Sequence, residues 1–481
     1  MVINPKRNPI SPLATPTSLP LNQEQRLRAR VALALDRLAQ LAFGLMVVTI
    51  PWRQRIVLQA RPRPPLYADF SDLLLFTHDI FLLTLLLMWG AGLVLRPRRL
   101  ATGPFFIWWP LLGLTTLALV SAITAVDPLL STYHAFYLLL LAGLYLYAVN
   151  EVRQLHFLAA AVAVQLGLQS AVALAQGWWQ QSLGLSWLGE HTLDLGAGSA
   201  FVWAEGALRS WRAYGLADHP NILAASLAFG MLLLAAWIVT SNGGTPAAAT
   251  ALFAASGVAL LTTFSRDTWI IFAAGVLVTI GLFWRTRQRR PLERWLILLG
   301  VLLLLLLPAV WLRLPYLRLG TGTEVIAARV EERLYQAAER EALNRAANEL
   351  FIGHAITGVG IGSLPVAMQQ QTTGLGFDYQ PARVTVLVAA AEVGLIGALF
   401  YFVLLLSPWL VLALRRQRLA SPLLLGLTGV LAAVTLFGLF DAYTWSYPSG
   451  RLWQWLIWGV WAAAYREGKV SSEQWTVNSK R

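Results

Sequence analysis

Two arginines, Arg212 and Arg266, each border a long apolar segment, and together they could bind an anion. Arg212 lies in the run RSWRAYGLADHPN just before one apolar segment, and Arg266 lies in TTFSRDTW between two others. A guanidinium group can bind two phosphate oxygens at once. If both side chains converge from their separate connectors, they form an anion site at the hydrocarbon edge, where a lipid-linked pyrophosphate carries its charge. The structural alternative is that Arg266 pairs with Asp267, and Arg212 with Asp218 or Glu205.

Histidines near these segments have structural interpretations as well as chemical ones. His219 and Asn221 flank Pro220 at the start of an apolar segment. Side chains at such a position commonly bind the free backbone amides of a helix, so capping is favoured over acid–base chemistry. His354 could act as a base, but a surface histidine is the favoured interpretation.

Three glycines, Gly358, Gly360 and Gly362, superficially suggest a phosphate-binding loop. No strand precedes them and no Lys-Ser/Thr pair follows them, so the nucleotide-binding motif is not met. The glycines therefore predict a tight backbone turn.

Glu392 lies inside an apolar segment close to Gly394 and Gly397. A buried glutamate beside small residues is typical of a partnered structural carboxylate at a close helix crossing, with a proton relay as the alternative. The pair His78-Asp79 has the same two interpretations. No spacing of His, Asp or Glu indicates a metal site.

The composition shows which elements must position these residues. The chain has 481 residues, of which 57% are hydrophobic and 13% are charged, whereas soluble domains carry about 25% charged residues. Apolar runs of about 20 residues indicate membrane-spanning helices and exclude the shorter strands of an outer-membrane barrel. With no cysteine in the chain, disulfides and thiol chemistry are excluded. The net charge of +13 comes mainly from span ends and indicates membrane topology rather than nucleic-acid binding.

The sequence therefore predicts an all-α, polytopic transmembrane helix bundle of about 12 spans with a long, partly helical extracytoplasmic loop. The predicted divisions are a disordered cytoplasmic arm at 1–30, spans one to nine at 31–312, the extracytoplasmic loop at 313–383, spans ten to twelve at 384–466, and a cytoplasmic tail at 467–481. The predicted spans lie near 31–51, 72–95, 104–125, 129–149, 155–178, 220–239, 247–264, 268–284, 294–312, 384–413, 421–440 and 451–465.

Arginine placement predicts the sidedness of the bundle. With a cytoplasmic N-terminus, the inner connectors hold Arg96, Arg98, Arg99, Arg153, Arg285, Arg287, Arg289, Arg290, Arg415, Arg416 and Arg418. The outer corners at 126–128 and 441–450 are almost free of basic residues. The first outer connector is an exception, since it holds Arg53, Arg55, Arg61 and Arg63. Both termini are expected in the cytoplasm, and connector 179–219, the corner at Ser265-Arg266 and the long loop are expected to share the outer face.

The long loop is predicted to contain an amphipathic helix. Thr321 and Glu324 match a capping box, and apolar residues recur after them at helical spacing. Glu341 and Arg345 form a favoured i,i+4 pair. Such a helix can lie on the membrane surface or over a cavity.

Three pieces of the sequence, taken in order, resemble the bacterial O-antigen ligase and O-antigen polymerase superfamily. They are R-x-Y-G-x-x-x-H-P-N at 212–221, the corner Ser265-Arg266, and Arg340 followed by HAITGVGIGSL at 354–364 and EVGLIG at 392–397. The resemblance covers about 200–400 and implies transfer of a glycan from an undecaprenyl-pyrophosphate donor to an acceptor sugar or lipid, on the outer leaflet of the inner membrane, without metal or nucleotide cofactor.

The resemblance also implies roles for individual residues. Arg212 and Arg266 would hold the pyrophosphate and stabilise its charge as it leaves, with Arg340, His219 and Asn221 as further substrate-binding residues. The implied partners are a lipid-linked glycan donor, an acceptor glycan or glycolipid, and the lipid bilayer, with no nucleic acid.

One position departs from the family pattern. Family members typically show His-Asn nine and eight residues before the glutamate matched by Glu392, and this chain has Arg383 and Val384 there. A guanidinium is a poor proton acceptor because its pKa exceeds ~12. Either another group serves as base, with His354, Asp378 and Glu339 as candidates, or Arg383 is a third phosphate contact, or the chain has lost transferase activity.

Two other functions fit the sequence. A transporter of small anions such as bicarbonate would have helices broken near the midplane, and Pro308 and Pro408 are the candidate break points. A catalytically inactive scaffold of a surface-polysaccharide assembly complex is the other alternative.

Overall fold

The computed structural model describes residues 23–152, 155–196, 198–203, 209–241, 246–317, 323–372, 377–414 and 421–478. Several residues of the sequence predictions lie outside this part of the chain. They are 1–22 of the N-terminal arm, Arg153, Glu205, the start of the capping box at Thr321 and Gly322, and Arg415, Arg416 and Arg418.

Twelve long helices form the bundle, and they follow the twelve predicted spans. They are α1 (Gln23–Thr49), α2 (Thr77–Leu95), α3 (Phe105–Ile123), α4 (Pro128–Glu151), α5 (Leu155–Trp179), α6 (Pro220–Thr240), α7 (Ala247–Thr262), α8 (Arg266–Arg285), α9 (Arg289–Leu317), α12 (Thr385–Leu414), α13 (Pro422–Phe440) and α15 (Pro448–Asn478). Within the described residues, 10 helices are long and apolar enough to cross a membrane, and α7 is a shorter apolar helix. The predicted fold class, an all-α polytopic bundle, is confirmed.

Short elements fill the connectors. They are the strands β1 (Arg55–Gln59), β2 (Leu73–Phe76), β3 (Phe201–Trp203) and β4 (Arg209–Trp211), the 3-10 turns η1 (Ala68–Phe70) and η2 (Ser186–Leu188), and the helices α10 (Thr323–Gly353), α11 (Leu364–Gln371) and α14 (Tyr443–Ser446). β1 pairs with β2 and β3 pairs with β4, both antiparallel.

One predicted boundary is wrong, and one helix extends beyond its predicted span. The second span was expected from residue 72, but Leu73–Phe76 is strand β2, and the helix begins at Thr77. A short apolar run does not distinguish a strand from a helix, and here the pairing with β1 decides. The chain also stays helical beyond the predicted end of the last span, because α15 continues to Asn478.

Helix α6 lies at the centre of the bundle. In its apolar stretch, 89% of the residues are buried, whereas only 17% are buried in the peripheral α9. It contacts α5, α7, α8, α9, α13 and α15. An apolar surface on all sides of a helix is typical of such a central position. Small residues permit helices α8 and α13 to cross closely. A Cβ at Gly275 of α8 would lie 2.8 Å from the Gly429 oxygen of α13.

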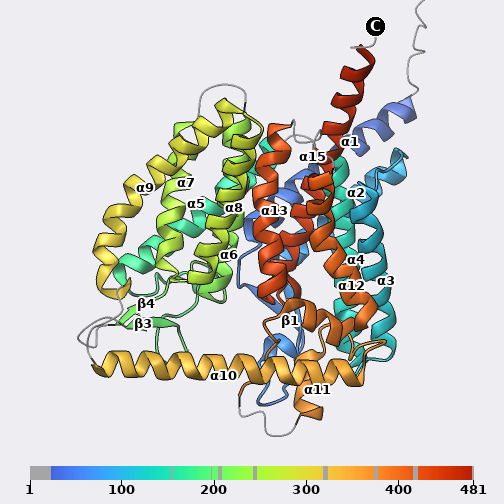
Figure 1. The fold of residues 1–481 in the computed structure, drawn as a ribbon. Coiled ribbons are helices and arrows are strands. Elements are labelled where there is room, and N and C mark those ends of the chain that lie inside the picture. Colours follow the sequence, from blue (N-terminus) through green and yellow to red (C-terminus); the bar gives the residue numbers. More distant parts are fainter. Residues whose placement is uncertain are drawn as a thin grey trace, which may run out of the picture.

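Figure 1 shows that the connectors with local structure gather at one end of the bundle. β1, β3, β4 and α11 lie there, and α10 runs across that end, while α1 begins and α15 ends at the opposite end. Connector 179–219, the corner before α8 and the long loop therefore share one end, as the sequence predicted.

The exceptional arginines of the first connector are bound by carboxylates at this same end. Arg53 and Arg55 contact Asp218 at 2.7 and 2.6 Å, and Arg61 and Arg63 contact Asp127 at 2.6 and 2.9 Å. Arg55 also reaches Asp69 at 2.8 Å. These arginines tie the connector between α1 and α2 to the starts of α4 and α6, which gives them a structural role separate from membrane topology.

Helix α12 is broken inside its span. Gly394 has φ 75° and ψ 175°, a backbone region that is essentially restricted to glycine. The expected break points, Pro308 and Pro408, lie within α9 and α12 with no such interruption at either. The about 20 residues after Gly394 are enough to cross the hydrocarbon core, so the break lies near the end that carries α10 and not at the midplane.

The glycine turn after α10 fits into this break. Val359 and Gly360 donate their amides to the oxygens of Ala391 and Glu392 at 2.8 and 3.0 Å. Gly358, Gly360 and Gly362 all have positive φ, from 73° to 103°, which confirms the predicted tight turn. The turn thus satisfies carbonyl groups that the broken helix leaves free.

Candidate functional site

The two connectors that carry Arg212 and Arg266 are joined by direct hydrogen bonds. The amide of Ala213 donates to the Thr262 oxygen at 3.0 Å, and Nε of Arg212 donates to the Thr263 oxygen at 2.7 Å. Thr263 lies in the corner between α7 and α8, and Arg266 is the first residue of α8. The connectors that carry the two arginines, far apart in sequence, are therefore joined in one local structure, and the convergence of the two guanidinium groups on one anion stays a prediction.

The segment between Arg212 and α6 is held by cap chemistry. The side chain of His219 accepts a hydrogen bond at Nδ1 from the Asn221 amide at 3.1 Å, which confirms the predicted cap. Arg212 donates to Oδ1 of Asn221 at 2.5 Å. Asn221 is exposed, and His219 keeps exposed surface although neighbouring groups desolvate its ring. Arg212 is thus oriented by the start of α6 and by the corner before α8.

Arg383 reaches the same place from the segment that precedes α12. Desolvation, followed by the positive charges of Arg212 and Arg383, lowers the pKa of His219 to about 3. Arg212 contacts Asn221, two residues from His219, directly, and the charge of Arg383 acts on the same histidine ring.

Asp441 is a member of this cluster that the sequence analysis did not select. Its carboxylate lies 4.0 Å from the Arg383 guanidinium. Burial raises the pKa of Asp441, the charges of Arg383 and Arg340 lower it, and the charge of Asp267 raises it. Arg340 belongs to α10 and Asp267 to α8. Asp441 therefore connects the end of α13 electrostatically to α8, α10 and the segment before α12.

The sequence offered one signal for Asp441. It is the acidic residue of the 441–450 corner, at the end of a predicted span and on the predicted outer face. Nothing in its spacing relates it to Arg383 or Arg340, which are distant along the chain. Only the packing of α12 against α13 brings these groups together.

Two of the structural alternatives for the central arginines, Arg212 with Asp218 and Arg266 with Asp267, do not hold among the described residues, whereas the third, Arg212 with Glu205, lies outside them. Asp218 binds Arg53 and Arg55, and Arg212 binds Asn221 and a backbone oxygen. Within the described part of the chain, Arg266 makes no ion pair with Asp267. Its side chain is exposed, so its charge is accessible to a ligand.

The other base candidates lie in different surroundings. Asp378 accepts a hydrogen bond from the Tyr67 hydroxyl at 2.6 Å, which, with burial and the nearby Asp378 and Glu339 charges, raises the pKa of Tyr67 to about 12. His354 lies at the end of α10 with Nδ1 3.1 Å from the Leu350 oxygen. Among the described residues, none of the candidates Asp378, Glu339 and His354 contacts Arg212 or Arg266.

Glu392 has the partnered structural role that its position indicated. It is 2% exposed and accepts a hydrogen bond from the Trp445 indole at 2.8 Å. The neighbouring pair His78-Asp79 is also buried, and Asp79 accepts a hydrogen bond from the Phe76 amide at 3.0 Å at the start of α2. Both carboxylates therefore serve local structure.

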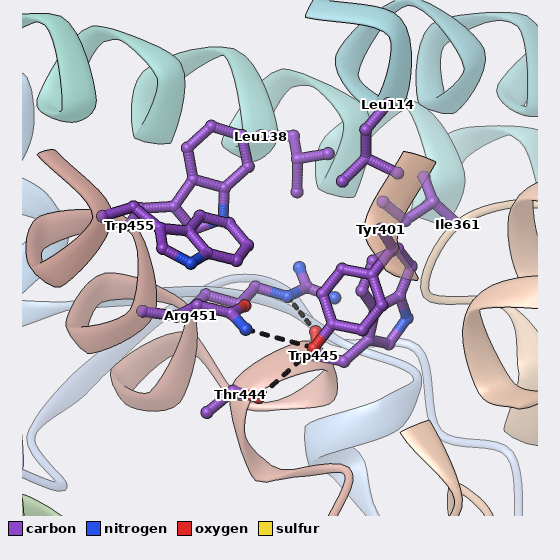
Figure 2. A pocket seen from close by; sticks show the side chains of 10 residues that line it. Leu114, Leu138, Ile361, Tyr401, Thr444, Trp445, Arg451 and Trp455 are labelled. Carbon is purple, nitrogen blue, oxygen red and sulfur yellow. Dashed lines mark hydrogen bonds between the residues drawn. The ribbon is translucent and has the colours of Figure 1, made fainter. Parts of the chain in front are cut away.

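A buried cavity lies behind the glycine turn, and Figure 2 shows Arg451, Tyr401 and Trp455 pointing into it. Nε of Arg451 donates to the Trp445 oxygen, and its NH1 group lies 3.1 Å from His134 Nδ1. None of Arg212, Arg266, Arg340 or Arg383 lines this cavity. We therefore assign it to the interior packing of the bundle and not to the arginine cluster.

The fold and the site together define a polytopic membrane protein with guanidinium groups gathered at one end of its helices. The family model for O-antigen ligase matches residues 251–402, a segment that contains Arg266, Arg340 and Arg383. The chain is thus related to O-antigen ligase over residues 251–402, and its long apolar helices make it a multi-pass bacterial membrane protein.

Comparison with other proteins adds little to this assignment. No curated protein matches the sequence. A solved structure titled "Structural coordination of polymerization and crosslinking by a peptidoglycan synthase complex" is 18% identical, with a TM-score of 0.36, and the match covers 76% of this chain and 98% of that chain. A likeness at this TM-score supports no conclusion about the present chain.

Proposed function

We propose that this protein transfers a glycan from an undecaprenyl-pyrophosphate donor to an acceptor sugar or lipid at the end of the bundle crossed by α10. The observation that carries the proposal is the hydrogen bond between Arg212 and Thr263, because it joins the Arg212 segment to the corner that presents Arg266. Two guanidinium groups held in one local structure match the oxygens of a pyrophosphate.

Charge balance supports an anionic ligand. Arg212, Arg340 and Arg383 act on this region, and Arg266 is exposed at the start of α8. The carboxylates there are Asp267, Asp441, Asp69 and Asp218, of which the last two are paired with Arg53 and Arg55. The cluster lies at the ends of α6, α8, α12 and α13, and the length of these apolar helices would place their ends at the depth of the lipid headgroups. A headgroup with more than one negative charge would offset the excess of positive charge there.

The same arrangement explains how the transfer would be accelerated. An acceptor hydroxyl attacks the anomeric carbon of the donor sugar, and the bond from that carbon to the phosphate oxygen breaks. Negative charge then develops on the departing pyrophosphate. Arg212 is already fixed by Asn221 and Thr263, so little reorganisation is needed to stabilise that charge. Arg383 is proposed as a further phosphate contact, in place of the family histidine.

The position of the α12 break weighs against the transport alternative. A transporter places broken helices at the bilayer midplane, around the transported ion. Here the break at Gly394 is filled by the glycine turn through the Val359 and Gly360 amides, and a full span follows it. The break supports the turn and the segment that carries Arg383.

Donor binding tests the proposal without knowledge of the glycan. We expect purified protein to bind undecaprenyl pyrophosphate more tightly than undecaprenyl monophosphate, as measured by native mass spectrometry. Arg212→Ala and Arg266→Ala should each weaken binding about tenfold or more, since a charged hydrogen bond contributes about 1.5–3 kcal/mol. The matched control is Arg345→Ala, because Arg345 is exposed on α10 and pairs only with Glu341 among described residues.

Glycan transfer in membranes that contain lipid-linked glycans provides the second readout. Both site variants should lose it while remaining inserted and folded, and Arg345→Ala should keep it. Full binding and full transfer in Arg212→Ala and Arg266→Ala would overturn the proposal. Anion flux through liposomes that hold the purified protein, abolished by the same substitutions, would instead favour transport.

A further inference from the structure

We infer that the Asp441 carboxylate is the group that accepts the proton of the acceptor hydroxyl, in place of the histidine that Arg383 replaces. This inference rests on the proposed function and adds to it a base, for which the sequence suggested His354, Asp378 and Glu339.

The backbone fixes Asp441 firmly. Its amide donates to the Phe437 oxygen at 2.9 Å, and its own backbone oxygen accepts a hydrogen bond from the Thr385 hydroxyl at 2.8 Å. Thr385 is the first residue of α12, two positions after Arg383. The end of α13 and the start of α12 are therefore joined directly beneath the side chains of Asp441 and Arg383.

One carboxylate oxygen of Asp441 is engaged and the other is available. Oδ1 accepts a hydrogen bond from the Tyr443 amide at 2.9 Å. Oδ2 has a loose contact with Arg383, at 4.0 Å, which is longer than a hydrogen bond. The side chain is 32% exposed, so an acceptor hydroxyl can approach Oδ2. A base needs this combination of a fixed carboxylate and a free oxygen.

The surroundings of Asp441 also adjust its basicity. Burial raises the pKa of Asp441, and the charge of Asp267 on α8 adds to that rise, while the Tyr443 amide, Arg383 and Arg340 on α10 oppose it. Tyr443 and Tyr447 face the same carboxylate, and its charge contributes to the raised pKa of both phenols. A carboxyl group with a raised pKa is a stronger base than an ordinary aspartate, and the positive charge of Arg383 favours its ionised form.

The histidine of the cluster is less suited to accept a proton. His219 has a pKa of about 3, and its Nδ1 already accepts the Asn221 amide. Asp441, in contrast, keeps Oδ2 free of a hydrogen bond among the described residues.

In the proposed transfer step, one bond forms at the anomeric carbon and one bond breaks there. The acceptor oxygen forms a bond to the anomeric carbon while its proton passes to Oδ2 of Asp441. The bond between the anomeric carbon and the phosphate oxygen breaks, and its electron pair stays on the pyrophosphate, next to Arg212 and Arg266. Asp441 then releases the proton to water, and the lipid pyrophosphate leaves with the charge.

Asp441→Asn is the decisive variant, because asparagine retains an oxygen for the Tyr443 amide and loses only the negative charge. We expect undecaprenyl pyrophosphate binding to stay within about twofold of wild type and glycan transfer to fall by about 10²–10⁴-fold, the usual contribution of general-base catalysis. Glu341→Gln, which removes an exposed carboxylate of α10, is the matched control and should retain transfer.

The pH profile of glycan transfer in a second variant tests the same inference. Wild-type transfer should fall on the acid side as Asp441 is protonated. Arg383→Gln removes a charge that lowers the pKa of Asp441, so the acid limb of the pH profile should move to higher pH. This shift does not depend on whether Asp441→Asn folds, and a purely structural role of Asp441 would not produce it.

Each result has one meaning. Normal transfer by Asp441→Asn, or an acid limb that Arg383→Gln leaves in place, would overturn the role of Asp441 and leave the proposed function standing, provided that Arg212→Ala and Arg266→Ala still lose donor binding. If those two arginine variants bind undecaprenyl pyrophosphate as well as wild type does, the proposed function fails first.

Discussion

At the scale of single residues, arginines of the predicted outer face fall into two groups with different surroundings. Arg53, Arg55, Arg61 and Arg63 are bound by carboxylates of other connectors. Arg266, in contrast, has an exposed side chain with no carboxylate partner among the described residues. Position in the sequence does not separate these groups, because both lie on the predicted outer face.

Asp127 provides a test of the bound group. Its buried carboxylate joins Arg61 and Arg63 and also accepts the Leu130 amide at the start of α4. Asp127→Asn keeps a cap oxygen and loses both ion pairs. We expect the folded protein to lose about 1.5–3 kcal/mol, the usual contribution of hydrogen bonds to a charged group, measured as a lower midpoint of thermal unfolding in detergent at neutral pH.

The pH dependence of that difference has a defined sign. Desolvation raises the pKa of Asp127, but the hydrogen bonds and charges of Arg61, Leu130 and Arg63 outweigh it, so the net pKa is lowered. A lowered pKa contributes stability above the unfolded value, about 3.9, which disappears as pH falls through the folded value. The gap between wild type and Asp127→Asn should therefore be full near pH 7 and narrow below about pH 4. A gap that widens toward acid would contradict the ion-pair interpretation.

The sequence was informative about individual side chains where chemistry depends on local spacing. The cap at His219 and the pair of Glu341 with Arg345, now seen at 2.7 Å, are examples. It was not informative about Asp441, because that residue gains its surroundings from Arg383 and Arg340, which only tertiary packing brings near it. Long-range electrostatics between separate connectors leaves no pattern in the local sequence.

At the scale of elements, the broken helix α12 and the glycine turn form one unit. A Cβ at Gly358 would lie 2.3 Å from the Glu392 carbonyl group, and a Cβ at Gly394 would lie 2.2 Å from the Ile356 oxygen. Each segment therefore requires glycine where the other approaches it. Glu392 and Trp445 tie the same unit to the segment between α13 and α15, so the turn helps to place Arg383 and Asp441.

Gly394→Ala tests that unit. The substitution places a side chain in a glycine-only backbone region, at a cost of about 1–3 kcal/mol, and against a backbone oxygen that cannot move freely. We expect a clearly lower unfolding midpoint and reduced transfer. Gly353→Ala is the matched control, since a Cβ there meets nothing within 4 Å. Equal stability of the two variants would show that the break does not hold the turn.

Elements with strong periodicity could be predicted, and short ones could not. The long helices and the amphipathic helix α10 follow from apolar periodicity, as expected. The hairpin of β1 and β2 was assigned in part to a span because Leu73–Phe76 is simply apolar. Pro308 and Pro408 were the candidate break points under the transport alternative, but Gly394 is the residue with the non-helical backbone in α12. Proline inside a membrane helix is tolerated, so its presence alone does not locate a break.

At the scale of the whole molecule, the bundle separates two kinds of surface. The end shown with α10 in Figure 1 carries the arginine cluster, the hairpins and the glycine turn. The opposite end carries short turns, such as the one between α8 and α9, where Arg285, Arg287, Arg289 and Arg290 lie. Composition and periodicity were sufficient to predict this arrangement, because a span of about 20 apolar residues leaves few alternatives.

The positive-inside rule assigns the arginine-rich turn between α8 and α9 to the cytoplasm and the α10 end to the outside, and labelling can test this directly. The chain has no cysteine, so single cysteines can be introduced without removing others. Asn348 on α10 and Arg290 near the start of α9 are both exposed. We expect a membrane-impermeant maleimide to label Asn348→Cys in intact spheroplasts and to label Arg290→Cys only after permeabilisation. The reverse pattern would put the arginine cluster on the cytoplasmic side, where an outer-leaflet donor cannot reach it, and the proposed glycan transfer would then be excluded.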